Sequence, residues 1–267
     1  MNRLADCVNL LGRFCGMRDV PSLTPEALQA AFGLRQADVM VLFGGSILCG
    51  GDLLARSMQL GVARNYIIVG GEGHTTESLR RLVHEEFPPI ETHAQPEAVV
   101  FARYLQYVYG LQPDYLECRS TNCGNNITNL LALLDQNAIP FDSIILCQDA
   151  SMQRRMDAGL RKHIAPGKRI INYAVYAAEV EAQNSRLIFR ENIRGMWDME
   201  RYISLLLGEI PRLADNADGY GPAGSGYIAH VDIPSDVQAA FEELCRAYPG
   251  LVRSANPLYA SARQSPV

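Results

Sequence analysis

Two short apolar runs, each followed directly by glycine, decide the fold. The run DVMVLF at 38–43 leads into GGS at 44–46, and the run YIIV at 66–69 leads into GGEGH at 70–74. A helical pattern follows each glycine segment. Short, continuously apolar strands that alternate with helices are typical of a parallel sheet covered on both faces. This stretch therefore predicts an α/β fold.

The same alternation continues outward from this stretch and weakens beyond residue 165. Strands are predicted at 38–43, 66–69, 115–117, 143–147 and 169–173, and helices at 52–60, 76–87, 96–109, from the 120s to near 135 and from the 150s to near 162. We expect a Rossmann-like three-layer fold with a mostly parallel sheet and a small C-terminal extension of helices and loops.

The two ends of the chain carry further helical patterns. An amphipathic helix is expected within 1–19, and a second one begins at Pro25 with Thr24 as its N-cap. Towards the C-terminus we predict a helix at 194–207 that contains the only tryptophan, Trp197, a loop or cap rich in glycine and proline at 208–233, and a helix at 235–247. The predicted organisation is a ligand-binding domain at 1–190, an extension packed on it at 191–253 and a flexible tail at 254–267.

Composition and charge narrow the classes of function. The net charge is −5 and the basic residues are scattered, so the basic stripe that nucleic-acid binding requires is missing. Seven cysteines without a CxxC pair fit buried thiols in a reducing compartment. No apolar run reaches the length of a signal peptide core or a membrane span. We therefore expect a cytoplasmic protein with a small-molecule ligand; its oligomeric state is not predicted.

Parallel strands reached by right-handed crossovers place their carboxyl ends at one edge of the sheet, where ligands of open α/β sheets bind. The predicted strand ends are rich in glycine and in polar side chains, and helix N-termini beside them suit anionic groups. Arg154 or Arg155 would add a bidentate partner for such a group. The candidate ligand-binding residues are Gly44, Gly45, Ser46, Gly70, Gly71, Ser120, Thr121, Asn122, Asn126, Gln148, Asp149, Met152 and Arg154.

Two arrangements of reactive residues are considered at this edge. His74, with Glu72, is the candidate general acid or base, because both follow the second strand. Cys123 is the alternative, as a nucleophile paired with His74, since a helix N-terminus lowers the pKa of a thiol. No HxxxH, HExxH or cysteine cluster is present, so no metal site is predicted. The dinucleotide fingerprint GxGxxG is also absent from both glycine segments.

At these positions the chain resembles the YdcF-like family. The resemblance rests on STNCG at 120–124, MQRR at 152–155, and the segment 200–232, which includes GEIPR at 208–212. It implies a Rossmann-like fold, a pocket at the strand ends and S-adenosylmethionine as a candidate ligand, without an established reaction. The pocket it implies draws on Gly44, Gly45, Gly70, Gly71, Glu97, Ser120, Thr121, Asn122, Asn126, Met152 and Arg154. Where the family often has His before the Met of the fourth loop, this chain has Ser151, which removes a shared general base.

Three hypotheses of function remain open. The first is a nucleotide-type ligand binder, with S-adenosylmethionine as ligand, that is also a possible enzyme. The second is a hydrolase or transferase that acts on a phosphorylated or sugar-linked envelope precursor. The third is a non-catalytic regulator that binds partners through 208–233.

Overall fold

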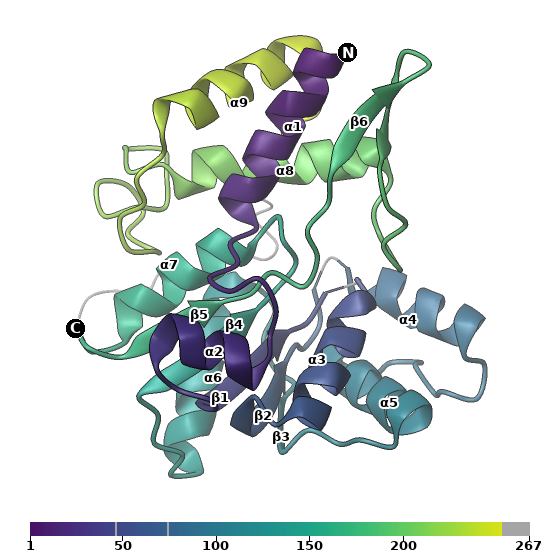
Figure 1. Cartoon of the computed structure of the whole chain (residues 1–267), viewed down its shortest axis with the longest axis vertical. Helices are drawn as coiled ribbons and strands as arrows, with labels where there is room; N and C mark the ends of the chain where they lie inside the picture. Colours follow the sequence, from purple (N-terminus) through teal and green to yellow (C-terminus); the bar gives the residue numbers. More distant parts are fainter. Residues whose placement is uncertain (46, 74, 253–267) are drawn as a thin grey trace.

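A computed structural model of the chain describes residues 1–45, 47–73 and 75–252. Its centre is a five-stranded sheet in which every strand pair is parallel, in the order β3-β2-β1-β4-β5 (Figure 1). The strands are β1 (Ala37–Phe43), β2 (Ala63–Val69), β3 (Tyr115–Glu117), β4 (Ser143–Cys147) and β5 (Arg169–Asn172). The predicted Rossmann-like α/β fold is thereby confirmed, and all five strands lie within a few residues of their predicted positions.

Helices cover both faces of this sheet. They are α2 (Pro25–Phe32), α3 (Cys49–Leu60), α4 (Thr76–Glu86), α5 (Glu97–Tyr109), α6 (Cys123–Gln136) and α7 (Gln153–His163). Alternate residues of β1 enter different cores: Met40 and Leu42 lie in the core that contains α3 and α5, whereas Val39 and Val41 lie in the core that contains α6 and α7. Because both faces are buried, the strand has to be apolar at every one of these positions.

The order of the strands reverses beside β1. The chain runs from β1 outward through β2 to β3, and then returns to the other side of β1 as β4. In open α/β sheets, the crevice between the two loops that leave such neighbouring strands is the usual ligand site. The relevant loops here are the one after β1, which begins at Gly44, and the one after β4, which begins at Gln148.

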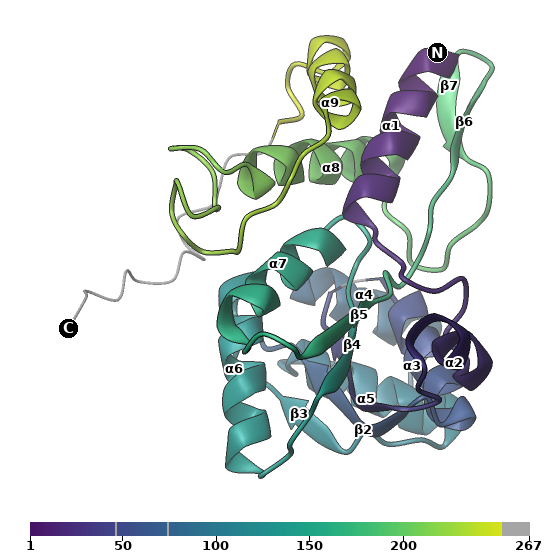
Figure 2. The same ribbon diagram turned by 60° about the vertical axis from the view of Figure 1, so that its left-hand side comes forward.

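A second group of elements lies beyond the carboxyl edge of the sheet. It consists of α1 (Asn2–Cys15), the antiparallel pair β6 (Val180–Gln183) and β7 (Arg186–Phe189), α8 (Met199–Leu213) and α9 (Ser235–Ala247). Figure 2 shows α1, from the N-terminus, beside α8 and the hairpin, and α1 also contacts α9. The first helix of the chain thus packs among elements from its C-terminal third.

Two predictions in this region are wrong. The helix predicted at 194–207 begins at Met199, because Asp198 accepts a hydrogen bond from the Arg201 amide at 2.7 Å and caps it there. Trp197 therefore precedes the helix, which extends to Leu213 and shortens the predicted loop at 208–233. The β6–β7 hairpin was not predicted. Its two-residue turn has positive φ at Asn184 and Ser185 without the glycine that usually marks such turns.

The N-cap of one other helix, α2, agrees with expectation. Thr24 accepts a hydrogen bond from the amide of Ala27, and Pro25 occupies the first turn of α2.

Among the helices of the described ranges, none combines the length and apolarity that a membrane span requires.

Candidate functional site

The loops after β1 and β2 approach each other so closely that both must begin with glycine. The amide of Gly44 donates to the carbonyl of Val69 at 2.7 Å, and the amide of Gly70 donates to that of Glu117 at 2.9 Å. A Cβ at Gly44 would lie 3.2 Å from the Cα of Gly70 and 2.4 Å from Oε2 of Glu97. The two glycines therefore leave room for the Glu97 side chain, which comes from the start of α5.

Glu97 is a buried carboxyl group at the sheet edge. Its Oε1 accepts hydrogen bonds from the hydroxyls of Thr76 at 2.8 Å and Thr75 at 3.1 Å, and Oε2 lies against Gly44 and Gly70. None of the described residues donates a hydrogen bond to Oε2, since both threonines bond Oε1. Burial raises the pKa of Glu97, and the two threonine hydroxyls oppose that shift in part. Glu97 thus presents one carboxyl oxygen at the point where β1 and β2 end.

The loops after β2 and β3 are joined in a similar way. The amide of Gly71 donates to the hydroxyl of Ser120 at 3.1 Å, and a Cβ at Gly71 would lie 2.3 Å from the Ser120 carbonyl oxygen. Ser120 is buried, and its amide donates to the carboxylate of Glu117 at 3.2 Å. Ser120 and Gly71 therefore form part of the wall of the sheet edge, in which their polar groups bind one another.

The start of α6 is organised by its own side chains. Asn122 is the N-cap and accepts a hydrogen bond from the amide of Asn125 at 2.9 Å. The hydroxyl of Thr121, which is exposed, donates to the side-chain oxygen of Asn125 at 3.1 Å. Asn126 lies in the first turn and is half-buried, and its amide nitrogen bonds the Asn122 carbonyl. These side chains line the β3 end of the same edge, beyond Ser120.

The crevice at the reversal of strand order is nearly closed. Gly45 and Gln148 face each other across it: a Cβ at Gly45 would lie 3.9 Å from Oε1 of Gln148. The space they enclose has a volume of about 10 Å³, which holds a single water molecule. It is lined by Leu42, Phe43, Gly45, Ile47, Gly50, Phe101, Gln148, Asp149 and Val175.

Asp149, at the wall of this crevice, is held by four donors from three segments. Its Oδ1 accepts bonds from the amide and hydroxyl of Ser151, at 2.8 and 2.7 Å, and from the hydroxyl of Tyr176 at 2.7 Å. Its Oδ2 accepts a bond from the indole nitrogen of Trp197 at 3.0 Å. Asp149 therefore joins the loop after β4 to the two segments that pass over it.

Three further candidate residues, Glu72, Arg154 and Met152, are described by their own contacts or burial. The side chain of Glu72 is 62% exposed and pairs with Arg80. Arg154 donates to the Phe14 carbonyl of α1 at 2.5 Å, and its guanidinium lies 4.1 Å from the centre of the Phe14 ring. Met152 is half-buried at the start of α7. The candidate residues Ser46 and His74 lie outside the described residues.

The alternative nucleophile, Cys123, has an unfavourable environment. Burial raises the pKa of its thiol, although the guanidinium of Arg155 opposes this shift. Arg155 is itself bound by both carboxylate oxygens of Glu209, at 2.6 and 2.9 Å. At neutral pH the thiolate form of Cys123 is therefore disfavoured, which argues against it as a nucleophile.

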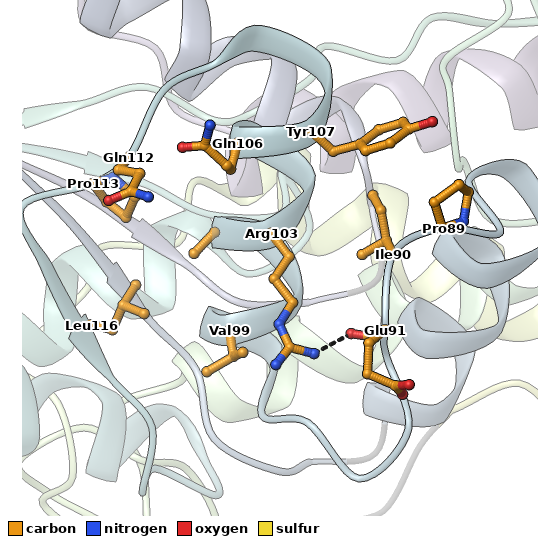
Figure 3. Close-up of a pocket in the computed structure, with 11 residues that line it drawn as sticks. Pro89, Ile90, Glu91, Val99, Arg103, Gln106, Tyr107, Gln112, Pro113 and Leu116 are labelled. Atoms are coloured by element: carbon orange, nitrogen blue, oxygen red, sulfur yellow. Dashed lines mark hydrogen bonds between the residues drawn. The ribbon is translucent and has the colours of Figure 1, made fainter.

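A much larger cavity lies away from this edge. An open groove of about 580 Å³ runs along the outside of α5 and the edge strand β3, where Tyr107 and Leu116 are exposed (Figure 3). Arg103 crosses it and donates to the Glu91 carbonyl. Although its volume suits a ligand, its lining is mainly apolar and it holds none of the glycine turns. We place the candidate site at the sheet edge, because buried polar groups and the reversal of strand order coincide there.

The sheet edge thus brings together Gly44, Gly45, Gly70, Gly71, Glu97, Ser120, Gln148 and Asp149, with Thr121, Asn122 and Asn126 at its β3 end and Met152 at its β4 end. Thr75, Thr76, Tyr176 and Trp197 contribute to it and were not predicted. In the sequence, these residues could have been suspected only from the two adjacent threonines at the start of a helix and from the single tryptophan after Gly195. A comparison of the chain with models of known protein families gave no match.

Proposed function

We propose that this protein binds a small nucleotide-type ligand, with S-adenosylmethionine as the candidate, at the carboxyl edge of its sheet. The observation that carries the proposal is the Glu97 carboxyl group, buried between Gly44 and Gly70 with Oε2 directed towards the edge. Burial of a carboxyl group costs free energy, and a site that binds a hydrogen-bond donor explains why such a group stands there.

S-adenosylmethionine has groups that match this edge. Its ammonium and ribose hydroxyls are hydrogen-bond donors suited to Glu97, and its carboxylate is suited to the amides at the start of α6. Bare glycine turns allow close approach of an adenosine. The resemblance of 120–124 and 152–155 to the YdcF-like family supports the same ligand. The proposal assigns a bound ligand and no reaction.

A phosphorylated or sugar-linked envelope precursor is a weaker candidate as the ligand. That hypothesis relied on Arg154 or Arg155 to bind phosphate, yet Arg154 bonds the Phe14 carbonyl and Arg155 is paired with Glu209. The Arg154 guanidinium faces α1, and the Arg155 guanidinium faces Glu209 of α8. Neither of the two arginines on which that hypothesis relied is therefore directed towards a phosphate at the sheet edge.

The proposal is tested by isothermal titration and thermal unfolding of the full chain with S-adenosylmethionine, S-adenosylhomocysteine and inorganic phosphate. We expect a rise in melting temperature with the first compound, and loss of the effect in Glu97→Gln. At a ligand concentration 100 times the dissociation constant, binding stabilises the folded state by about 2.7 kcal/mol. Glu85→Gln, which alters an exposed carboxylate in the last turn of α4, is the matched control. No stabilisation of the wild type at millimolar S-adenosylmethionine would contradict the proposal.

A further inference from the structure

One segment, residues 190–198, contacts both loops that flank the crevice at the reversal of strand order, and we call it the strap. Gly195 of the strap packs on the loop after β1, where its Cβ position lies 3.0 Å from the Leu48 amide nitrogen. Two residues later, Trp197 donates to Asp149 in the loop after β4. The strap thus bridges the two loops between which Gly45 and Gln148 enclose the crevice.

The two halves of the strap differ in the number of polar interactions that hold them. Arg194 donates to the hydroxyl of Tyr104 at 2.7 Å and is paired with Glu86, and its guanidinium stacks over the ring of Phe87. Asp52 also lies 3.5 Å from the Arg194 guanidinium. On the other half, Trp197 makes one hydrogen bond, to Asp149 at 3.0 Å, and lies beside Arg201. The Arg194 half is therefore an anchor and the Trp197 half a single latch.

The strap packs on the surface of the core, where the side chains of Ile193, Met196 and Trp197 lie against buried apolar residues. Each of its residues from 191 to 198 is half-buried or exposed. Backbone hydrogen bonds hold the strap at its two ends, where the Arg190 amide donates to the Glu179 carbonyl and the Tyr202 amide donates to the Asp198 carbonyl; among the described residues no backbone bond joins it to the five-stranded sheet. A segment whose side chains are only partly buried opens at a smaller cost in free energy than global unfolding.

A crevice of about 10 Å³ cannot hold a nucleotide-type ligand, which needs several hundred cubic ångströms. A ligand that extends from Glu97 into this crevice therefore requires the loops after β1 and β4, and the strap that bridges them, to move apart. We propose that the strap is a lid over the ligand site, closed by the hydrogen bond from Trp197 to Asp149 and opened when that bond breaks. The identity of the ligand rests on the function proposed above, whereas the latch is defined by the contacts of the strap.

The latch is tested first in the ligand-free full chain. Trp197→Phe removes the donor and keeps an aromatic ring, while Tyr176→Phe removes another donor to the same carboxylate from outside the strap. Because a hydrogen bond to a charged group contributes about 1.5 kcal/mol or more, amide hydrogen exchange in 190–198 should be about tenfold faster in Trp197→Phe. It should be unchanged in Tyr176→Phe. Unchanged exchange in Trp197→Phe, or equal acceleration in both variants, would overturn the latch.

The role of the lid is then tested with S-adenosylmethionine as the probe. Association with immobilised protein, followed by surface plasmon resonance, should be about tenfold faster in Trp197→Phe and unchanged in Tyr176→Phe. In the wild type, emission from Trp197, the only tryptophan, should become more accessible to acrylamide as the probe enters. If the wild type binds the probe and Trp197→Phe associates no faster, the strap is not a lid. If the wild type binds no probe, the proposed ligand is wrong, and the exchange experiment alone decides the latch.

Discussion

The crevice at the carboxyl edge of the sheet and the groove outside α5 are opposite in character. The crevice has about 10 Å³ of free space, and it is walled by the buried polar side chains of Gln148 and Asp149 beside the Gly45 turn. The groove has about 580 Å³ and exposes apolar side chains such as those of Tyr107 and Leu116. The free volume of a pocket depends on whether the protein is in its open or its closed state. Buried polar groups and close backbone approaches cost free energy in both states, so their presence needs an explanation in both. The chemistry of a surface is therefore the better guide to the site.

The largest effect should come from adding a side-chain atom at Gly44, where the loop after β1 lies close to Gly70 and Glu97. In Gly44→Ala the new Cβ would lie 2.4 Å from Oε2 of Glu97, and we expect a loss of about 3 kcal/mol in the free energy of unfolding. Gly45→Ala is the matched control, because its Cβ meets only Gln148 Oε1 at 3.9 Å. Denaturant unfolding of both variants measures the difference. Equal stability of the two would show that the contact between Gly44 and Glu97 is not tight.

A smaller effect is expected in the strap, which contacts the loops on both sides of the crevice. Gly195 has φ of 76° and no room towards Leu48, so Gly195→Ala combines a left-handed residue with a close contact. We expect a loss of about 2 kcal/mol. Gly33→Ala carries a similar φ of 72° without a neighbour within 4 Å, and should lose about 1 kcal/mol. Thermal unfolding compares them. A loss in Gly195→Ala no larger than that in Gly33→Ala would mean that the strap does not press on the loop after β1.

The next effect is a dependence of stability on pH that comes from the buried carboxyl group of Glu97. Because the pKa of Glu97 is raised in the folded state, its contribution to stability is present at low pH. It is lost as the pH rises from about 4.3, the ordinary pKa of glutamate, through the raised value. Glu97→Gln cannot ionise and should gain stability relative to the wild type over that window. Unfolding free energies measured between pH 4 and 8 test the sign; a difference that is independent of pH would contradict it.

The smallest effect should come from the groove. Leu116→Lys and Tyr107→Ser change exposed side chains, so each should alter stability by no more than about 0.5 kcal/mol. Neither should alter the dissociation constant for S-adenosylmethionine in isothermal titration. A severalfold loss of affinity in either variant would move the candidate site from the crevice to the groove and reverse the comparison above.

Much of the fold could be predicted from the sequence because its signals are local. The apolar runs of β1 and β2 and the cap at Thr24 can each be identified from neighbours within a few residues. The glycines at 44 and 70–71 mark the strand ends just as locally, although the close approach that requires them is tertiary. The hairpin β6–β7 and the start of α8 were missed. The hairpin turn uses Asn184 and Ser185 in place of glycine, and the cap by Asp198 prevailed over a helical pattern that continued further upstream.

For the site, sequence alone determined which residues would stand at the carboxyl edge of the sheet, because parallel strands with right-handed crossovers all end on one side. Only the tertiary structure decided what those residues touch. It turned Arg154 to the ring of Phe14, surrounded Asp149 with Tyr176 and Trp197, and enclosed Glu97 between two glycines. Those partners are separated by up to 140 residues along the chain. Propensity and periodicity act over a few residues, whereas such contacts depend on how whole layers pack, and no local pattern encodes that packing.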